Sequence, residues 1–158
     1  MLQASEFFVG FVADAQPLSL MLPRGKYEQP FLIAWREEEA MAVFIGTEHR
    51  FQAMPCAGNT HWKGVIVPNV AVEVDQASMF NPEEGNLSEG CLVRRDTRLV
   101  LTTLKQDRFS YGGYDRLAVA DGLSNCAEGM EVAFRVWSVT LGLGRDKRTL
   151  FKIAPPTA

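Results

Sequence analysis

Residues 31–46 have the sequence FLIAWREEEAMAVFIG, and this stretch indicates the fold class of the whole chain. Two apolar runs, 31–37 and 40–46, flank a group of glutamates, and both alternating faces of each run are apolar. We therefore expect a hairpin of two strands that is covered on both faces. Because the Glu38-Glu39 connection contains no glycine, a loop longer than a tight two-residue turn is expected.

The same pattern of short apolar stretches with period two, separated by Gly, Pro, Asn or charged pairs, continues along the chain. Val, Ile, Thr and aromatic residues are frequent in these stretches, as is typical of strands. The predicted strands are 31–37, 40–46, 50–54, 62–67, 70–75, 91–95, 98–104, 116–120, 131–141 and 148–153. Gly142 and Gly144 permit a second hairpin between the last two. This pattern predicts a mainly β fold, an antiparallel barrel or a two-layer sandwich, with an α+β fold as the alternative.

One or two short helices are expected beside the strands. Residues 5–15 place an apolar stripe at helical spacing after a capping Ser5, although the same residues also fit a strand. Gly10 disfavours the helix by about 1 kcal/mol. Asn81 followed by Pro82 predicts one helical turn, with the asparagine as its cap.

Length and composition bound the kind of protein. The chain has 158 residues, 47% of them hydrophobic and 22% charged, which is typical of one globular domain covering 1–158 with a frayed tail at 155–158. Sixteen basic and nineteen acidic residues give a net charge of −3, so no overall basic field attracts nucleic acid or a membrane. The start of the chain lacks the basic segment of a signal peptide, and a soluble, cytoplasmic protein is expected.

The three cysteines, Cys56, Cys91 and Cys126, have no CxxC spacing. Reduced thiols are therefore expected, with no resident metal and no cofactor. His49 or His61 could ligate a metal together with Glu48, Glu73 or Asp75. Hydrogen-bonded loop histidines are the favoured alternative, because no HExxH motif is present.

The first candidate site lies around Trp62, Glu73 and Asp75. If Pro68-Asn69 closes a hairpin, Trp62 falls opposite Asp75, and two carboxylates about 7 Å apart lie beside an aromatic side chain. Such a cleft suits a sugar, a cationic ligand or a divalent metal. The alternative is that both carboxylates simply face water on an outer strand.

Two further clusters could bind ligands. Arg94, Arg95 and Arg98 flank a predicted turn, and their guanidinium groups fit phosphate or carboxylate; a solvated turn is the alternative. Tyr111 and Tyr114 surround Gly112-Gly113 and would form a recognition surface; the alternative is that Phe109 and Tyr114 fold back as a lid on the core.

The residues alone favour a non-enzymatic module that binds a small molecule of unknown class in an aromatic and acidic cleft. The alternatives are a cofactor-independent hydrolase or isomerase, with Glu73, Asp75 or His61 as acid or base, and a homodimeric interaction module. No nucleophile motif or phosphate-binding glycine loop is present in the sequence.

Overall fold

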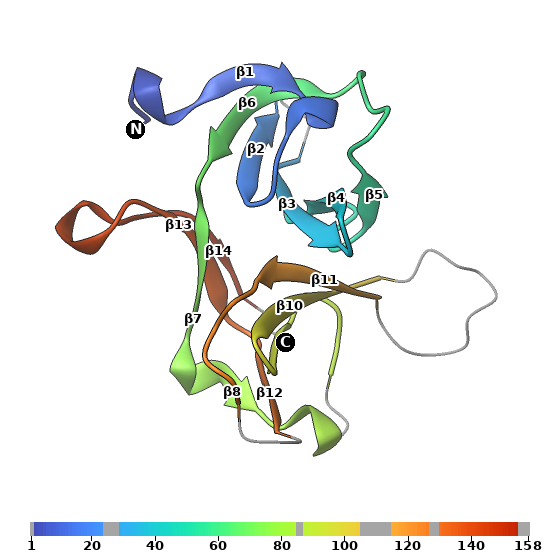
Figure 1. Ribbon diagram of the computed structural model, residues 1–158, viewed down its shortest axis with the longest axis vertical. Coiled ribbons are helices and arrows are strands. Elements are labelled where there is room, and N and C mark those ends of the chain that lie inside the picture. Colours follow the sequence, from blue (N-terminus) through green and yellow to red (C-terminus); the bar gives the residue numbers. More distant parts are fainter. Residues whose placement is uncertain (1, 24–28, 85–86, 105–114, 127–129, 155–158) are drawn as a thin grey trace. The chain divides into compact units, whose positions relative to one another are not determined.

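The computed structural model describes residues 2–23, 29–84, 87–104, 115–126 and 130–154. The chain divides into two compact units, Met1–Val70 and Ala71–Ala158, and each is described by itself. Within each unit the strands pair antiparallel, and the helical segments of the described residues are short 3₁₀ turns (Figure 1). The prediction of a mainly β fold with antiparallel sheets is confirmed, and the described strands of neither unit close into a barrel.

The N-terminal unit is built on six strands that pair in the order β1-β6-β2-β3-β4-β5. Its elements are η1 (Ala4–Glu6), β1 (Phe8–Phe11), η2 (Val12–Asp14), β2 (Ser19–Pro23), β3 (Phe31–Arg36), β4 (Glu39–Phe44), β5 (Ala53–Pro55) and β6 (Lys63–Pro68).

The predicted hairpin at 31–46 is confirmed as β3 and β4, but its turn is tighter than expected. Arg36 lies opposite Glu39, so only Glu37 and Glu38 connect the strands. Glu37 takes a positive φ of 54°, a conformation that was expected to need glycine. The prediction of a longer loop was therefore wrong, because pairing along both strands outweighs the cost of one unfavourable backbone angle.

The helix predicted over 5–15 does not form. Residues 8–11 are strand β1, which pairs with β6, and only η1 and η2 on either side of it are helical. Gly10 lies directly opposite Gly64 in this pair. The alternative interpretation of these residues as a strand is correct. Pairing with β6 satisfies their backbone hydrogen-bonding groups, whereas a short helix would have to satisfy them within itself.

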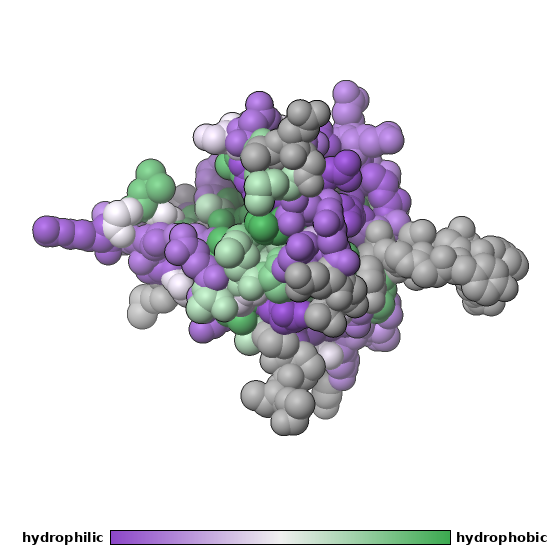
Figure 2. Space-filling model, turned by 90° about the horizontal axis from the view of Figure 1, so that it is seen from below, coloured by the Kyte–Doolittle hydropathy of each residue, from purple (hydrophilic) through white to green (hydrophobic). Residues whose placement is uncertain are grey.

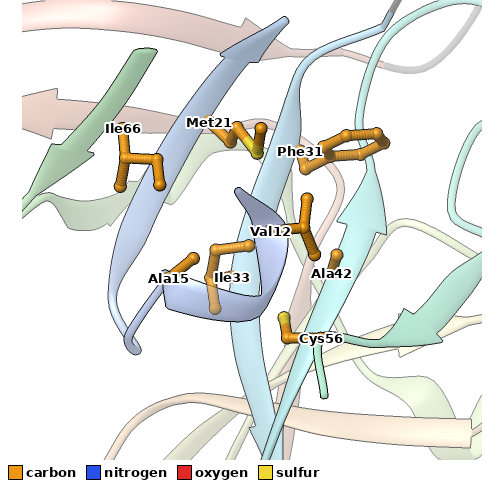
Figure 3. Packing of buried hydrophobic residues seen from close by; sticks show 8 residues of the cluster. All are labelled: Val12, Ala15, Met21, Phe31, Ile33, Ala42, Cys56 and Ile66. Carbon is orange, nitrogen blue, oxygen red and sulfur yellow. The ribbon is translucent and has the colours of Figure 1, made fainter. Parts of the chain in front are cut away.

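The core of the N-terminal unit gathers side chains from strands far apart in the sequence (Figure 3). Phe31 and Ile33 of β3 and Ile66 of β6 are fully buried there. The whole cluster comprises Val12, Ala15, Met21, Phe31, Ile33, Ala42, Cys56 and Ile66. β3 and β4 are thus covered, as their apolar faces predict.

The C-terminal unit contains two sets of paired strands, β11-β10-β9-β12-β8 and β14-β13-β7. Its elements are β7 (Ala71–Val74), η3 (Gln76–Ser78), β8 (Met79–Phe80), η4 (Pro82–Glu84), β9 (Leu92–Arg95), β10 (Arg98–Thr103), β11 (Asp115–Ala120), β12 (Glu131–Phe134), β13 (Trp137–Leu141), η5 (Gly144–Asp146) and β14 (Arg148–Ile153). The predicted helical turn at Asn81 is confirmed as η4, where the Asn81 side chain accepts from the Glu83 amide at 3.0 Å.

The predicted strand 131–141 is two strands that belong to different sheets. β12 ends at Phe134 and β13 begins at Trp137. Between them the Val136 amide donates to the Ser78 hydroxyl at 3.0 Å, so the ladder is interrupted by a side-chain acceptor. The hairpin of β13 and β14 is confirmed, with positive φ at Gly142 and Gly144.

Among the described residues, no helix has the length and apolar character that crossing a membrane requires. Figure 2 shows both hydrophilic and hydrophobic side chains at the surface, with the hydrophilic ones predominating in this view.

Candidate functional site

Trp62 belongs to the packing of the N-terminal unit. Its ring meets Phe31 edge-on, with centroids 5.5 Å apart, and Phe44 at 6.3 Å. The side chain is half-buried against the core cluster. Edge-to-face aromatic contacts of this kind stabilise a fold without any ligand.

The hairpin predicted from Pro68-Asn69 is wrong. β6 pairs with β1 and β2, whereas β7 pairs with β13. Trp62 is therefore not the strand partner of Asp75, and Gly64 is not that of Glu73. Instead Gly64 faces Gly10 and Glu73 faces Ser138. Proline at position 68 and a positive φ of 60° at Asn69 end the strand without returning it on itself.

Both predicted carboxylates have partners within the C-terminal unit. Glu73 accepts from the Lys147 ammonium at 2.6 Å, and both side chains are close to half exposed. Asp75 caps the turn η3 by accepting from the Ala77 amide at 3.0 Å. These contacts give each carboxylate a local structural role. This role is compatible with the alternative interpretation, in which both carboxylates face water on an outer strand.

The two histidines are exposed, and the His49 ring lies 6.0 Å from that of Phe44. No three His, Cys, Asp or Glu side chains of the described residues gather in a geometry that could hold a metal ion. Tyr111 and Tyr114, together with the glycines between them, lie outside the described residues.

The arginine cluster lies on the hairpin of β9 and β10. Arg95 is the direct partner of Arg98 across the two strands, and Asp96 and Thr97 form the turn between them. Asp96 takes a φ of 49°, which aspartate tolerates better than most residues. Two like charges directly opposite each other destabilise an antiparallel pair, so this arrangement is unfavourable for the hairpin alone.

A third guanidinium comes from β11. Arg116 pairs with Thr102 of β10 in the sheet, yet its Nη2 lies 3.0 Å from Oε1 of Glu131 on β12. Since β10 and β9 lie between β11 and β12, the Arg116 and Glu131 side chains extend toward each other over these two strands. Glu131 is also the strand partner of Arg95, so the ion pair brings Arg116 toward the other two arginines.

An open pocket of about 480 Å³ lies at this place. Its lining residues are Arg95, Asp96, Thr97, Arg98, Val100 and Arg116. Three positive side chains and one negative one therefore surround it. A pocket with converging guanidinium groups is suited to a phosphate or a carboxylate, because each planar fork can donate two parallel hydrogen bonds.

Carboxylates already contact these arginines, but loosely at the turn. Nε of Arg95 lies 3.8 Å from Asp96, and Nε of Arg98 lies 3.4 Å from Asp121. All four side chains are about half exposed or more, so the pairs contribute little to stability. Nε is the arginine atom of the contact in both pairs.

The segment 121–126 is fastened to the turn of this hairpin. The Leu123 amide donates to Thr97 O at 3.0 Å, and the Cys126 amide donates to Asp96 O at 3.3 Å. Arg94 donates to the carbonyl oxygens of Asp96 and Ser124. Of the three predicted anion-binding arginines, the structure thus brings Arg95 and Arg98 to the pocket and uses Arg94 as a clamp outside its lining.

Asp121 takes part in this contact between the segment 121–126 and the hairpin turn. It accepts from the Gly122 amide at 2.7 Å and from the Thr97 hydroxyl at 3.2 Å. The Gly122 hydrogen bond, followed by Thr97 and Arg98, holds the pKa of Asp121 below the ordinary range of a carboxyl group. Asp121 is therefore charged at neutral pH and faces the same guanidinium group that a bound anion would use.

Sequence reasoning missed Val100, Arg116 and Glu131 as site residues. Arg116 is 18 positions from Arg98 in the sequence, and Glu131 is 33 from it. Only the pairing of β11 with β10 and of β12 with β9 brings them together. The one signal in the sequence was the position of Arg116 at the start of a predicted strand.

A family model covers nearly the whole chain. Residues 9–155 match the y4lG family, which is described as an uncharacterised protein. The chain belongs to the y4lG family. A relative named uncharacterized protein y4lG, from Sinorhizobium fredii (strain NBRC 101917 / NGR234), is 36% identical over 152 residues, 96% of this chain and 92% of the relative. No solved structure matches the chain.

Proposed function

We propose that this y4lG-family protein is a non-enzymatic module that binds a small anionic molecule in the pocket on β9, β10 and β11. The observation that carries the proposal is the direct opposition of Arg95 and Arg98 across the hairpin, with Arg116 lining the same pocket. An anion between the guanidinium groups would turn a repulsive pair into a favourable one.

The pocket is consistent with binding rather than catalysis. Its described lining contains no histidine, cysteine or serine, and its carboxylate, Asp96, lies 3.8 Å from Nε of Arg95. Glu73 and Asp75, the carboxylates of the alternative hydrolase or isomerase, are engaged with Lys147 and with the backbone of η3. The geometry therefore favours the binding module.

Thermal unfolding with increasing inorganic phosphate tests the proposal. A ligand at about 100 times its Kd adds about 2.7 kcal/mol, which raises the Tm by several degrees. We expect this rise in the wild type and its loss in Arg95→Gln and in Arg98→Gln. The effect should weaken as sodium chloride is added, because salt screens exposed charges.

Arg145→Gln is the matched control. Arg145 is an exposed arginine of the same unit on the β13–β14 hairpin, and its substitution changes the net charge equally. An identical Tm rise in the wild type and all three variants would mean that phosphate acts elsewhere and would reject the pocket.

The alternative of a self-associating module has one specific observation in its favour. Phe8, Val9 and Phe11 of β1 are 42%, 61% and 37% exposed, and β1 is the first strand in the sheet order of its unit. Such a strand can add a second chain to the sheet. The Phe11 amide is already bonded to Asp14 at 3.1 Å, which removes one donor from that edge. Light scattering of wild type and Val9→Lys tests it, and a monomer in both rejects self-association.

A further inference from the structure

We infer that the pocket takes an organic anion, in which a phosphate or carboxylate group is attached to a nonpolar body, in preference to an inorganic anion. This inference rests on the proposed function and adds the chemical class of the ligand. Two features of the pocket lining support it: the nonpolar side chain of Val100 and the position of the Arg116 side chain.

Val100 forms a nonpolar part of the pocket lining. It lies two residues after Arg98 on β10, so both side chains point to the same face of the sheet. Its strand partners are Val93 on β9 and Ala118 on β11, and both are buried. Val100 itself is only half-buried, so an apolar surface is left open between charged groups.

The stem of Arg116 adds to this nonpolar surface. Its guanidinium pairs with Glu131, whose side chain is 18% exposed, and the Arg116 side chain lines the pocket. The methylene groups of a long basic side chain cover apolar surface while the charged end stays polar. The guanidinium plane also offers a face on which a flat ring can lie.

The size of the pocket agrees with a larger ligand. At about 480 Å³ it falls within the range of about 300–1,000 Å³ that is common for small-molecule sites. An inorganic anion at Arg95 and Arg98 would leave Val100 in water. A nonpolar body attached to the anion would remove that surface from water, and the gain rises with the apolar area covered.

Isothermal titration of the full chain with two pairs of probes tests the inference. Methyl phosphate and phenyl phosphate carry the same anion, as do acetate and benzoate, and each pair differs only in its nonpolar part. We expect the phenyl compound of at least one pair to bind about tenfold more tightly than its partner, which corresponds to about 1.4 kcal/mol.

Val100→Ser should reduce that ratio toward one and leave the affinity for the small anion unchanged. Val132→Ser is the control, because Val132 is also half-buried and pairs with Arg94, on the opposite face of the same sheet. Should Val100→Ser fail to fold by circular dichroism, Val100→Thr keeps the branched shape and replaces one methyl group by a hydroxyl.

Three results would overturn the inference in different ways. Equal affinities within both pairs, each weakened by Arg95→Gln, would remove the nonpolar requirement and keep the anion site. A preference that survives substitution of Val100 would place the nonpolar contact elsewhere. Failure of both pairs to bind would remove the proposed function together with the inference.

Discussion

Two hairpins of this chain have the same turn and opposite charge patterns. β3–β4 and β9–β10 are each closed by two residues, and the first turn residue has a positive φ, 54° at Glu37 and 49° at Asp96. Next to the turn, Arg36 faces Glu39 in the first hairpin, whereas Arg95 faces Arg98 in the second. The first arrangement is favourable for the hairpin itself and the second is not.

The two hairpins also differ in what surrounds them. β3 and β4 contribute Phe31, Ile33 and Ala42 to a buried core, and Arg36 and Glu39 form a pair of opposite charge at the end of the hairpin. The end of β9–β10 instead opens into a pocket with Arg116 in its lining. Turn geometry alone therefore does not distinguish the two hairpins; the opposed arginines and the adjacent cavity do.

The largest expected effect lies in the core beneath the first hairpin. Phe31→Ala should lower the free energy of unfolding by about 3–5 kcal/mol, because a fully buried aromatic ring is removed. Urea unfolding followed by circular dichroism measures this loss. Phe8→Ala, at a residue 42% exposed in the same unit, is the control and should cost far less. Equal losses in both variants would contradict the structural role of the first hairpin.

The second prediction uses the cysteines that are fastened to the two hairpins. The Cys56 amide donates to Ala40 O of β4, and the Cys126 amide donates to Asp96 O of the second turn. Burial, and then the negative charge of Glu39, raises the pKa of the Cys56 thiol from 9.0 to about 11. Its thiolate fraction at pH 8 should thus be lower than that of an ordinary thiol by about a hundredfold.

Alkylation with iodoacetamide, followed by peptide mass spectrometry, should label the half-exposed Cys126 well before Cys56. Because its pKa is raised in the folded state, Cys56 contributes stability that is present below pH 9.0 and is lost as the pH rises toward about 11. Labelling of Cys56 at the rate of Cys126 would show that the first hairpin is open to solvent.

The third prediction concerns the carboxylate that competes at the second hairpin. Asp121→Asn should tighten phosphate binding by about two- to fivefold, the range expected when an exposed competing charge is removed from Arg98. Asp146→Asn, an exposed aspartate elsewhere in the same unit, should leave the affinity unchanged.

The pH dependence of this effect follows from the pKa of Asp121. Because that pKa lies below the ordinary range, Asp121 stays charged between pH 5.5 and 7.5. Measured with sulfate, whose charge is the same throughout this interval, the gain from Asp121→Asn should therefore be equal at both ends. A gain confined to pH 7.5 would mean that Asp121 titrates higher than its hydrogen bonds imply.

The mainly β fold and the hairpins β3–β4 and β13–β14 could be predicted, because the alternation of apolar residues and the choice of turn residues act locally. β2 was missed because its apolar segment, Ser19–Pro23, is short and bounded by prolines at 17 and 23. The proximity of Arg95 and Arg98, which belong to the proposed anion site, could be predicted because a hairpin brings near neighbours in sequence together. Arg116 and Glu131 could not, because their meeting depends on which strands become neighbours in the sheet.

The smallest expected effect comes from giving the first hairpin the charge pattern of the second. Glu39→Arg places an arginine opposite Arg36 and should lower the free energy of unfolding by about 0.5 kcal/mol. Glu38→Arg makes the same charge change within the turn, where no residue lies directly opposite, and should cost less. Urea unfolding of both variants beside the wild type measures the difference.

Glu39→Arg should not create a phosphate site, and this outcome tests what the second hairpin requires. Two opposed arginines would then exist at both hairpins, but only the second would have Arg116 in place beside a pocket. The test adds Glu39→Arg to the Arg98→Gln variant, which lacks the opposed arginine pair of the second hairpin. A phosphate-dependent rise in Tm in this double variant, beyond that of Arg98→Gln alone, would show that an opposed arginine pair binds anions by itself. No added rise would mean that the third arginine and the cavity are needed, so that the pocket, rather than the charge pair alone, defines the site.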